Sequence, residues 1–245
     1  MRKEEVYMKW FKVFLILLFV GASFVAFADY DVISDNFNRG SLGNWKPISG
    51  SWRVMNGKLS QVDTRENMAM IVVPAYQSGK VLYEFDVEYI DGGQDDYAGF
   101  GFHICINNPS SMRSWGNGKS MLAWVTWDPK AYGSPGGFIQ IYESKGNTNM
   151  GLYTGLYPGS DPLKYGDLIA IPRSYLDIKY INYRVPVKIM IDTRTGEGRF
   201  YDPFAPDQYY YSFDLGAPIM SGGYFAIRTN SVALSFDNVT ITKLD

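Results

Sequence analysis

Apolar and polar residues alternate with a period of two along most of the chain, and this pattern limits the possible folds more than any other feature. In 81–89 the odd positions are all apolar, whereas Glu84, Asp86 and Glu88 occupy even positions. Successive side chains of a strand point to opposite faces, so the pattern is typical of a sheet with one face in a core. Further predicted strands are 68–73, 99–106, 121–127, 137–142, 185–192, 199–201, 223–228 and 233–242.

Glycine-containing turns separate these strands, at 91–93, 135–137 and 195–198. The last is expected to close a hairpin between 189–192 and 199–201. We predict no helix of three turns after residue 28, and the strands do not alternate with helical segments. The sequence therefore predicts an all-β fold, a two-sheet antiparallel β-sandwich.

The first 28 residues have the three parts of a secretory signal peptide. Basic residues precede the apolar run 13–20, and Ala26-Phe27-Ala28 forms a small-residue cleavage site. We therefore expect a signal peptide at 1–28, a single domain at 29–245, and a secreted, periplasmic or cell-envelope location. The alternative is an uncleaved membrane anchor, which would be the chain's only association with a membrane.

The charge pattern and the single cysteine exclude several classes of protein. The formal net charge is −2 with no block of like charges, which argues against nucleic acid as a partner. One cysteine, Cys105, cannot form an internal disulfide, and one histidine, His103, gives little support to a zinc site. In 99–106 both are expected to lie on the face opposite Phe100, Phe102, Ile104 and Ile106.

Two segments carry a family resemblance. Near the start the chain reads D-N-F at 35–37, G-S-L-G-N-W at 40–45 and G-S-W-R-V-M-N-G-K-L at 50–59. Near the end it reads G-G-Y-F-A-I-R at 222–228 and F-D-N-V at 236–239. Together they resemble the opening and closing strands of concanavalin A-like lectin/glucanase domains, including laminin-G-like and laminarinase-like members. The resemblance implies that the domain at 29–245 is a concanavalin A-like jelly roll. That superfamily contains enzymes, lectins and adhesion modules, so the resemblance indicates a fold and not an activity.

The same segments allow local predictions from their residues alone. Trp45 and Trp52 should bury their rings at the edge of the sandwich. Asn56-Gly57 suits a two-residue hairpin turn. Phe236 and Val239 cannot share a face in a regular strand, which indicates a bulge near Asp237-Asn238.

The strongest catalytic pattern is the row of carboxylates Glu84, Asp86 and Glu88 on one strand face. Laminarinase- and lichenase-like enzymes carry such an E-x-D-x-E strand, in which acid and nucleophile roles are divided between carboxylates. The tryptophan-rich strand that precedes it in those enzymes is absent here, which favours a solvated acidic face. We predict no catalytic residue; if the chain is a polysaccharide-active hydrolase or lyase, the candidates are these three residues and His103, which adjacent strands could bring near Glu84 or Asp86.

Aromatic residues in or near loops suggest a carbohydrate site, because sugar C–H faces stack on rings while amides bind hydroxyls. The candidate ligand-binding residues are Trp115, Trp124, Trp127, Asn107 and Gln140. One of Trp124 and Trp127 should point away from the core. We therefore predict an exported, non-catalytic carbohydrate-binding domain for a poly- or oligosaccharide; the alternatives are the hydrolase or lyase above and a structural or adhesion protein of the cell envelope.

The resemblance also implies one structural calcium ion, bound where the first and last strands meet. The matching positions are Asp35, the turn at Gly57, and Asp237, which could supply carboxylate and carbonyl oxygens. The alternative is that Asp35 accepts a turn hydrogen bond and Asp237 forms part of a bulge.

Overall fold

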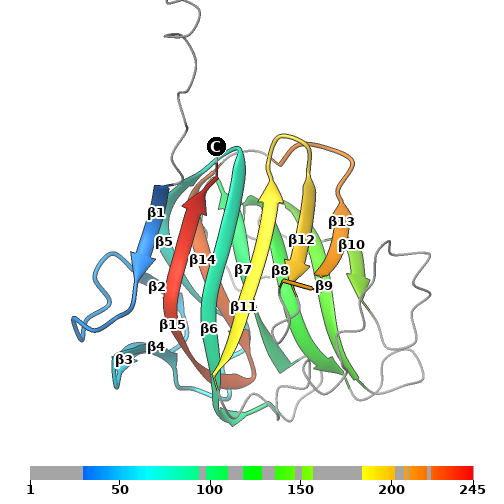
Figure 1. Cartoon of the computed structure of the whole chain (residues 1–245). Coiled ribbons are helices and arrows are strands. Elements are labelled where there is room, and N and C mark those ends of the chain that lie inside the picture. The colour runs from blue at the N-terminus through cyan, green and yellow to red at the C-terminus, as the bar shows by residue number, and fades with distance from the viewer. Residues whose placement is uncertain are drawn as a thin grey trace, which may run out of the picture.

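The computed structural model describes residues 30–93, 98–109, 118–128, 136–146, 151–156, 184–201, 207–208, 210–219 and 222–244, and two antiparallel sheets account for most of them (Figure 1). The described residues contain no helix, so none of them forms a helix able to cross a membrane. The strands are β1 (Tyr30–Asp35), β2 (Lys46–Ser49), β3 (Trp52–Met55), β4 (Lys58–Gln61), β5 (Ala69–Gln77), β6 (Lys80–Gly92), β7 (Ala98–Ile106), β8 (Lys119–Asp128), β9 (Gly136–Lys145), β10 (Gly151–Leu156), β11 (Val185–Asp192), β12 (Glu197–Tyr201), β13 (Tyr210–Asp214), β14 (Gly222–Asn230) and β15 (Val232–Lys243).

The eight-stranded sheet has the order β13-β12-β11-β6-β15-β4-β3, and β1 pairs with the free part of β15. The first and last strands of the chain are thus neighbours, with Asp35 opposite Val239. β4 lies farther along the same edge of β15, with Leu59 opposite Phe236. The seven-stranded sheet has the order β10-β9-β8-β7-β14-β5-β2 and lies behind the first in Figure 1.

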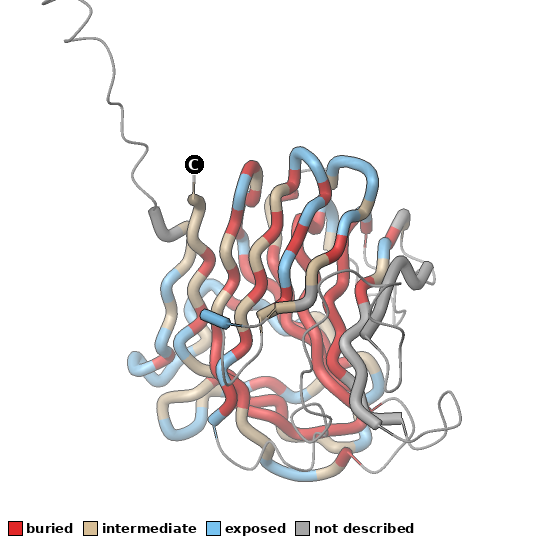
Figure 2. The backbone as a smooth tube through the Cα atoms, turned by 45° about the vertical axis from the view of Figure 1, so that its right-hand side comes forward, coloured by how far each residue is buried: buried red, intermediate tan, exposed pale blue. Residues whose placement is uncertain are grey.

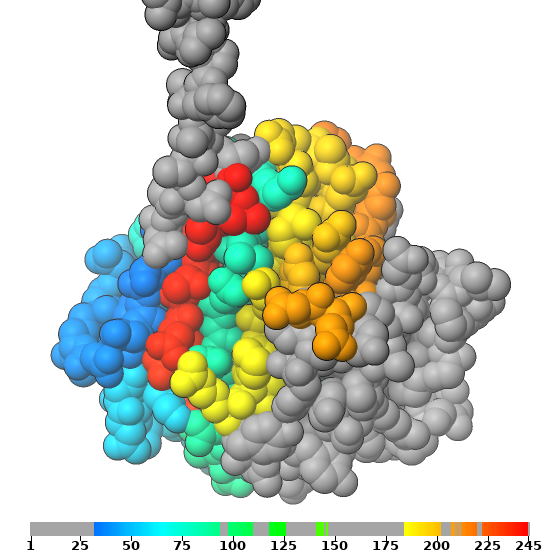
Figure 3. All heavy atoms as spheres, viewed as in Figure 1, coloured from blue at the N-terminus to red at the C-terminus, as the bar shows by residue number. Residues whose placement is uncertain are grey.

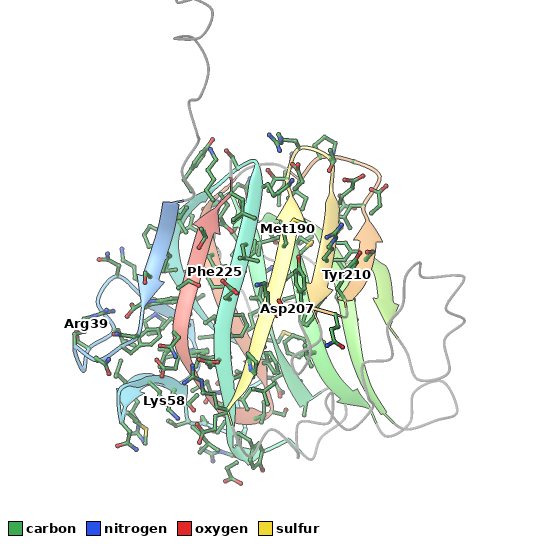
Figure 4. The ribbon with its side chains drawn as sticks, viewed as in Figure 1. Arg39, Lys58, Met190, Asp207, Tyr210 and Phe225 are labelled. Atoms are coloured by element: carbon green, nitrogen blue, oxygen red, sulfur yellow. The ribbon has the colours of Figure 1, made fainter. Side chains whose placement is uncertain are left out.

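Side chains from both sheets meet in an aromatic core. Tyr83 stacks on Phe225 with 5.7 Å between ring centroids, and Phe85 meets Phe102 edge-on at 5.2 Å. Phe225, labelled in Figure 4, lies between the two sheets. Figure 2 shows buried residues concentrated in the strands and exposed residues at their connections. The alternation places these large rings on the inner face of each sheet. Burying their apolar surface between the sheets stabilises the sandwich.

Two of the predicted turns are present, whereas the glycines of the predicted turn 135–137 lie in β9 and residue 135 is outside the described residues. Met55 pairs with Lys58 across Asn56-Gly57, and both turn residues have positive φ, at 51° and 72°. That conformation matches the right-handed twist of the flanking strands. β11 and β12 form the expected hairpin, in which Ile191 lies opposite Gly198.

The predicted bulge in the last strand is also present. The register between β15 and β6 shifts between Asp237 and Thr240, and Asn238 has a φ of 49°. The extra residue lets Phe236 and Val239 both bury in the core. Trp45 and Trp52 are buried as expected.

One expected face assignment is wrong. The prediction placed Ile106 with Phe100, Phe102 and Ile104, and Cys105 on the opposite face. Cys105 has a φ of 57° and packs in the core, whereas Ile106 packs against Met70, Val72 and Ala226 outside it. A residue in the left-handed conformation interrupts alternation, so every side chain after this bulge changes face.

Candidate functional site

The outer face of the seven-stranded sheet displays the most exposed large apolar side chain in the described part of the chain. Val73 and Ala75 of β5 point into the core, while Pro74 and Tyr76 are exposed on the other side. Tyr76 is 67% exposed. A tyrosine ring left in water near the end of a long strand is available for contact with a ligand.

A second tyrosine extends this surface across the neighbouring strand. Tyr224 of β14 lies opposite Pro74 on one side and opposite Ile106 of β7 on the other. It is half-buried and packs on the small apolar cluster formed by Met70, Val72, Ile106 and Ala226. We call Pro74, Tyr76 and Tyr224 the tyrosine face.

The buried side chain of Gln77 holds the tyrosine face in place. Its Nε2 donates to the backbone oxygens of Ala75 (2.9 Å) and Tyr224 (2.7 Å). Its Oε1 accepts hydrogen bonds from the hydroxyl of Tyr83 (2.9 Å) and the backbone N–H of Cys105 (3.1 Å). One side chain therefore connects β5 to β14, β7 and β6, which presents Tyr76 on a fixed backbone and reduces the ordering cost of binding.

Two exposed amides border the tyrosine face. Asn107 and Asn108 follow Ile106, the residue opposite Tyr224. Oδ1 of Asn107 accepts a 2.9 Å hydrogen bond from the backbone N–H of Lys119, which closes the end of the β7–β8 pair. Gly118 makes this close approach possible, because a Cβ there would come within 2.6 Å of that same Oδ1. The predicted ligand-binding residue Asn107 thus lies at the same end of the sheet as the two tyrosines.

Farther along the same outer face is a buried polar group. Nε2 of His103 lies 3.1 Å from an Arg228 amino nitrogen, and its Nδ1 lies 3.0 Å from the Ser120 hydroxyl. Burial, together with the neighbouring guanidinium, holds the pKa of His103 well below its usual value, so the ring is neutral and accepts from Arg228. Burial also lowers the pKa of Arg228 to about 10, which leaves it charged at neutral pH.

The predicted tryptophans are not an exposed platform within the described residues. Trp124 points away from the core residues Ala123 and Val125, as expected, but it is only 2% exposed and packs over Gly101. The backbone of Trp127 lies in β8 opposite Gly137, and that of Gln140 lies in β9 opposite Trp124. The side chains of Trp127 and Gln140 are not among those that the structure describes. Trp115 lies outside the described residues entirely.

The three carboxylates of β6 lie on the outer face of the eight-stranded sheet, and each has a basic partner. Figure 3 shows this face of the molecule. Glu84 pairs with Lys188 at 3.1 Å, Asp86 with Arg184, and Glu88 with Lys58. Asp86 also accepts a 2.8 Å hydrogen bond from the Asn238 amide. The carboxylates form an acidic face opposite the buried residues Phe85 and Val87, as predicted, but the face is not solvated throughout, because Asp86 is only 8% exposed.

The expected approach of His103 to Glu84 or Asp86 is wrong. His103 belongs to β7 of the seven-stranded sheet, and the carboxylates belong to β6 of the eight-stranded sheet. Because their side chains lie on the two outer faces of the sandwich, the core separates them. The four candidate catalytic residues therefore do not form one site.

The three positions of the calcium prediction converge, but Asp35 does not fit as a ligand. β1 ends and β4 begins beside the β15 bulge at Asp237. Gly57 lies close to the segment that follows β1, since a Cβ added to it would be 3.1 Å from Oδ1 of Asn38. Both Asp35 oxygens already accept hydrogen bonds, from Arg39, the Phe37 backbone and the Trp45 indole. Among the described residues no group of three or more Asp, Glu, His or Cys could hold a metal. Calcium binding stays a prediction.

The sequence prediction missed Tyr76 and Tyr224. The predicted strand 68–73 stopped before Pro74, because proline is rare inside strands. Proline is accommodated here opposite Tyr224, beside a register shift. The alternation of Val73 and Ala75 with Pro74 and Tyr76 was the available signal that the strand continues and displays the tyrosine.

Comparison with known proteins defines the fold. No protein-family model matches this sequence, and no curated protein matches it. A carbohydrate-binding module, CBM66 from Bacillus subtilis, has a TM-score of 0.53 at 14% identity, covering 82% of this chain and 96% of the module. A legume lectin-like domain from Entamoeba histolytica has a TM-score of 0.51 at 9% identity, covering 87% and 97%. A carbohydrate esterase from the Shiga toxin-encoding bacteriophage phi24B has a TM-score of 0.52 at 11% identity, covering 89% and 100%.

These similarities confirm the predicted fold class: the chain is an all-β protein with the two-sheet antiparallel sandwich of these solved structures. At such identities they establish the fold alone.

Proposed function

We propose that this chain is an exported, non-catalytic carbohydrate-binding domain that contacts a poly- or oligosaccharide with the tyrosine face. The observation that supports this most directly is the 67% exposed ring of Tyr76 on a strand fixed by the buried Gln77. Aromatic rings with a few well-placed polar groups are the usual composition of small-molecule sites.

The neighbouring groups suit a sugar. Tyr76 and Tyr224 offer ring faces for sugar C–H groups, and the exposed amides of Asn107 and Asn108 can donate to and accept from hydroxyls. The carbohydrate-binding module and the legume lectin-like domain with this fold also support a carbohydrate ligand. Export is supported by the signal-peptide pattern at 1–28, which lies outside the described residues.

The absence of catalysis is supported by the ion pairs of Glu84, Asp86 and Glu88. A carboxylate engaged with a cation is less free to act as an acid or a nucleophile, and these three lie on the face opposite the tyrosine face. The phage carbohydrate esterase of the same fold makes a carbohydrate-active enzyme the second candidate.

A glycan array followed by titration calorimetry tests binding. We expect Tyr76→Ala to weaken binding at least tenfold while the melting temperature stays within about 2 °C of the wild type, since exposed side chains contribute little to stability. The matched control is Ile90→Ala, which truncates an exposed apolar side chain (44%) on the other sheet and should leave binding unchanged. Unchanged affinity in Tyr76→Ala would remove the tyrosine face from the proposal.

Turnover assays address the second candidate. Release of reducing sugar or of acyl groups from the bound glycan would contradict a non-catalytic role. Loss of that release in Glu84→Gln or Glu88→Gln would locate it on β6. Silence in both the array and the turnover assays would instead favour a structural or adhesion protein of the envelope.

A further inference from the structure

The two sheets differ in charge. β2, β5, β7 and β14 are consecutive in the seven-stranded sheet and contain no Asp or Glu, although the whole chain has 25 of them. Their charged side chains are Lys46 and Arg228. In the other sheet, β6 alone contributes Glu84, Asp86, Glu88 and Asp91. The tyrosine face therefore lies on β5 and β14, within a group of four strands whose charged side chains are all basic.

Lys46 lies on the same outer surface as the tyrosine face. It is exposed on β2 and pairs with Val72, whose side chain packs in the outer apolar cluster with Tyr224. Cross-strand partners share a face. Pro74 is two residues farther along β5, about 7 Å from Val72 at the usual rise per residue, so a ligand on Pro74 and Tyr224 comes within reach of the long lysine side chain.

Lys46 is also available for a ligand. None of the described residues forms an ion pair with it, whereas Lys58 and Lys188 on the other sheet pair with Glu88 and Glu84. An exposed ammonium group beside an aromatic surface, in strands without carboxylates, attracts anions and orients them.

From these observations we infer that the glycan bound at the tyrosine face is anionic, carrying carboxylate or sulfate groups, and that Lys46 contacts its charge. The inference rests on the proposed carbohydrate-binding function. It adds the ligand's chemical class and a residue that selects for it.

Two pairs of polymers, each with one backbone in a charged and a neutral form, test the inference. The first pair is polygalacturonate and its methyl ester, and the second is dextran sulfate and dextran; the pairs separate carboxylate from sulfate recognition. We expect the charged member of at least one pair to bind tightly, its neutral partner to bind at least tenfold more weakly, and added salt to reduce the difference.

Two lysine variants locate the contact. We expect Lys46→Gln to weaken binding of the charged polymer about threefold to fivefold, the upper part of the range for an exposed charge pair. Lys188→Gln removes a lysine from the opposite face and should leave affinity unchanged. Equal weakening by both variants would indicate non-specific attraction and overturn the role of Lys46. Tight binding of neutral glycans only, lost in Tyr76→Ala, would overturn the anionic ligand while the proposed function stands; no glycan binding at all would overturn the function itself.

Discussion

The indole N–H of Trp45 donates a 2.9 Å hydrogen bond to Oδ2 of Asp35, ten residues earlier in the chain. Arg39 contacts both oxygens of the same carboxylate, at 2.7 and 2.8 Å, and the Phe37 backbone N–H donates to Oδ1 at 2.9 Å. Trp45 in turn packs edge-on against Phe225 of the core, with centroids 6.2 Å apart. One carboxylate thus fixes the corner where β1 leads toward β2, and it connects that corner to the sandwich.

Asp35→Asn should destabilise the fold by about 1–3 kcal/mol, because it weakens charge-assisted hydrogen bonds to Arg39 and Trp45. Partial burial raises the pKa of Asp35, but its hydrogen bonds outweigh this and hold the pKa below the ordinary value. The stabilisation is therefore present above the unfolded-state pKa near 4 and lost as the pH falls through the lower folded-state pKa.

Urea unfolding at pH 7 and at successively lower pH measures both effects. The control is Glu197→Gln, an exposed carboxylate on β12 that should change stability by no more than about 0.5 kcal/mol. Equal stability of Asp35→Asn and the wild type at pH 7 would contradict the structural role of this corner.

Calcium should leave the melting temperature unchanged if Asp35 keeps its present partners, because a cation would first have to displace Arg39. Thermal unfolding with calcium and with a chelator is the measurement. A rise in melting temperature with calcium that disappears in Asp237→Ala would instead support the site predicted from the sequence. A rise that persists in that variant would place the ion elsewhere.

Stability should fall as the pH drops below about 6.5, the unfolded pKa of histidine. The folded pKa of His103 is lower, because the ring is buried beside Arg228. At a pH between the two pKa values the unfolded chain binds more protons than the folded chain, so unfolding becomes more favourable on acidification. As His103 is the chain's only histidine, His103→Gln should flatten this dependence between pH 7.5 and pH 5, while its amide oxygen still accepts from Arg228. Unfolding curves that retain the wild-type pH dependence in the variant would exclude His103 as its source.

Gly101→Ala should destabilise the protein by about 1–3 kcal/mol, the usual cost of overpacking. A Cβ at this position would lie 2.3 Å from the backbone oxygen of Ala123 and 2.6 Å from Cε3 of Trp124, in the buried layer of the seven-stranded sheet. Gly223→Ala in β14 is the matched control, since its Cβ would meet no atom within 4 Å. Chemical unfolding of the two variants gives the comparison, and similar losses would show that lost glycine flexibility, not crowding against Ala123 and Trp124, is responsible.

Much of the fold and some of the site could be predicted from the sequence, wherever the information is local. The alternation in β6 predicted both the buried face of Phe85 and Val87 and the acidic face of Glu84 and Glu88. Asn56-Gly57 predicted its hairpin, and the spacing of Phe236 and Val239 predicted the bulge. Asn107 follows Ile106, the residue opposite Tyr224, and its predicted role in ligand binding stays a prediction.

The tertiary structure decided which sheet each strand joins and which outer faces stay open. Alternation shows that His103 and Glu84 both leave the core, but only strand order places them on opposite sides of it. The same rule places Trp124 and Tyr76 on one outer face, yet Trp124 is 2% exposed and Tyr76 is 67% exposed. The alternation along a strand shows which side chains share a face, because side-chain direction depends on neighbouring residues in the chain. Whether that face is buried depends on contacts between residues far apart in the sequence, and a local pattern does not contain them.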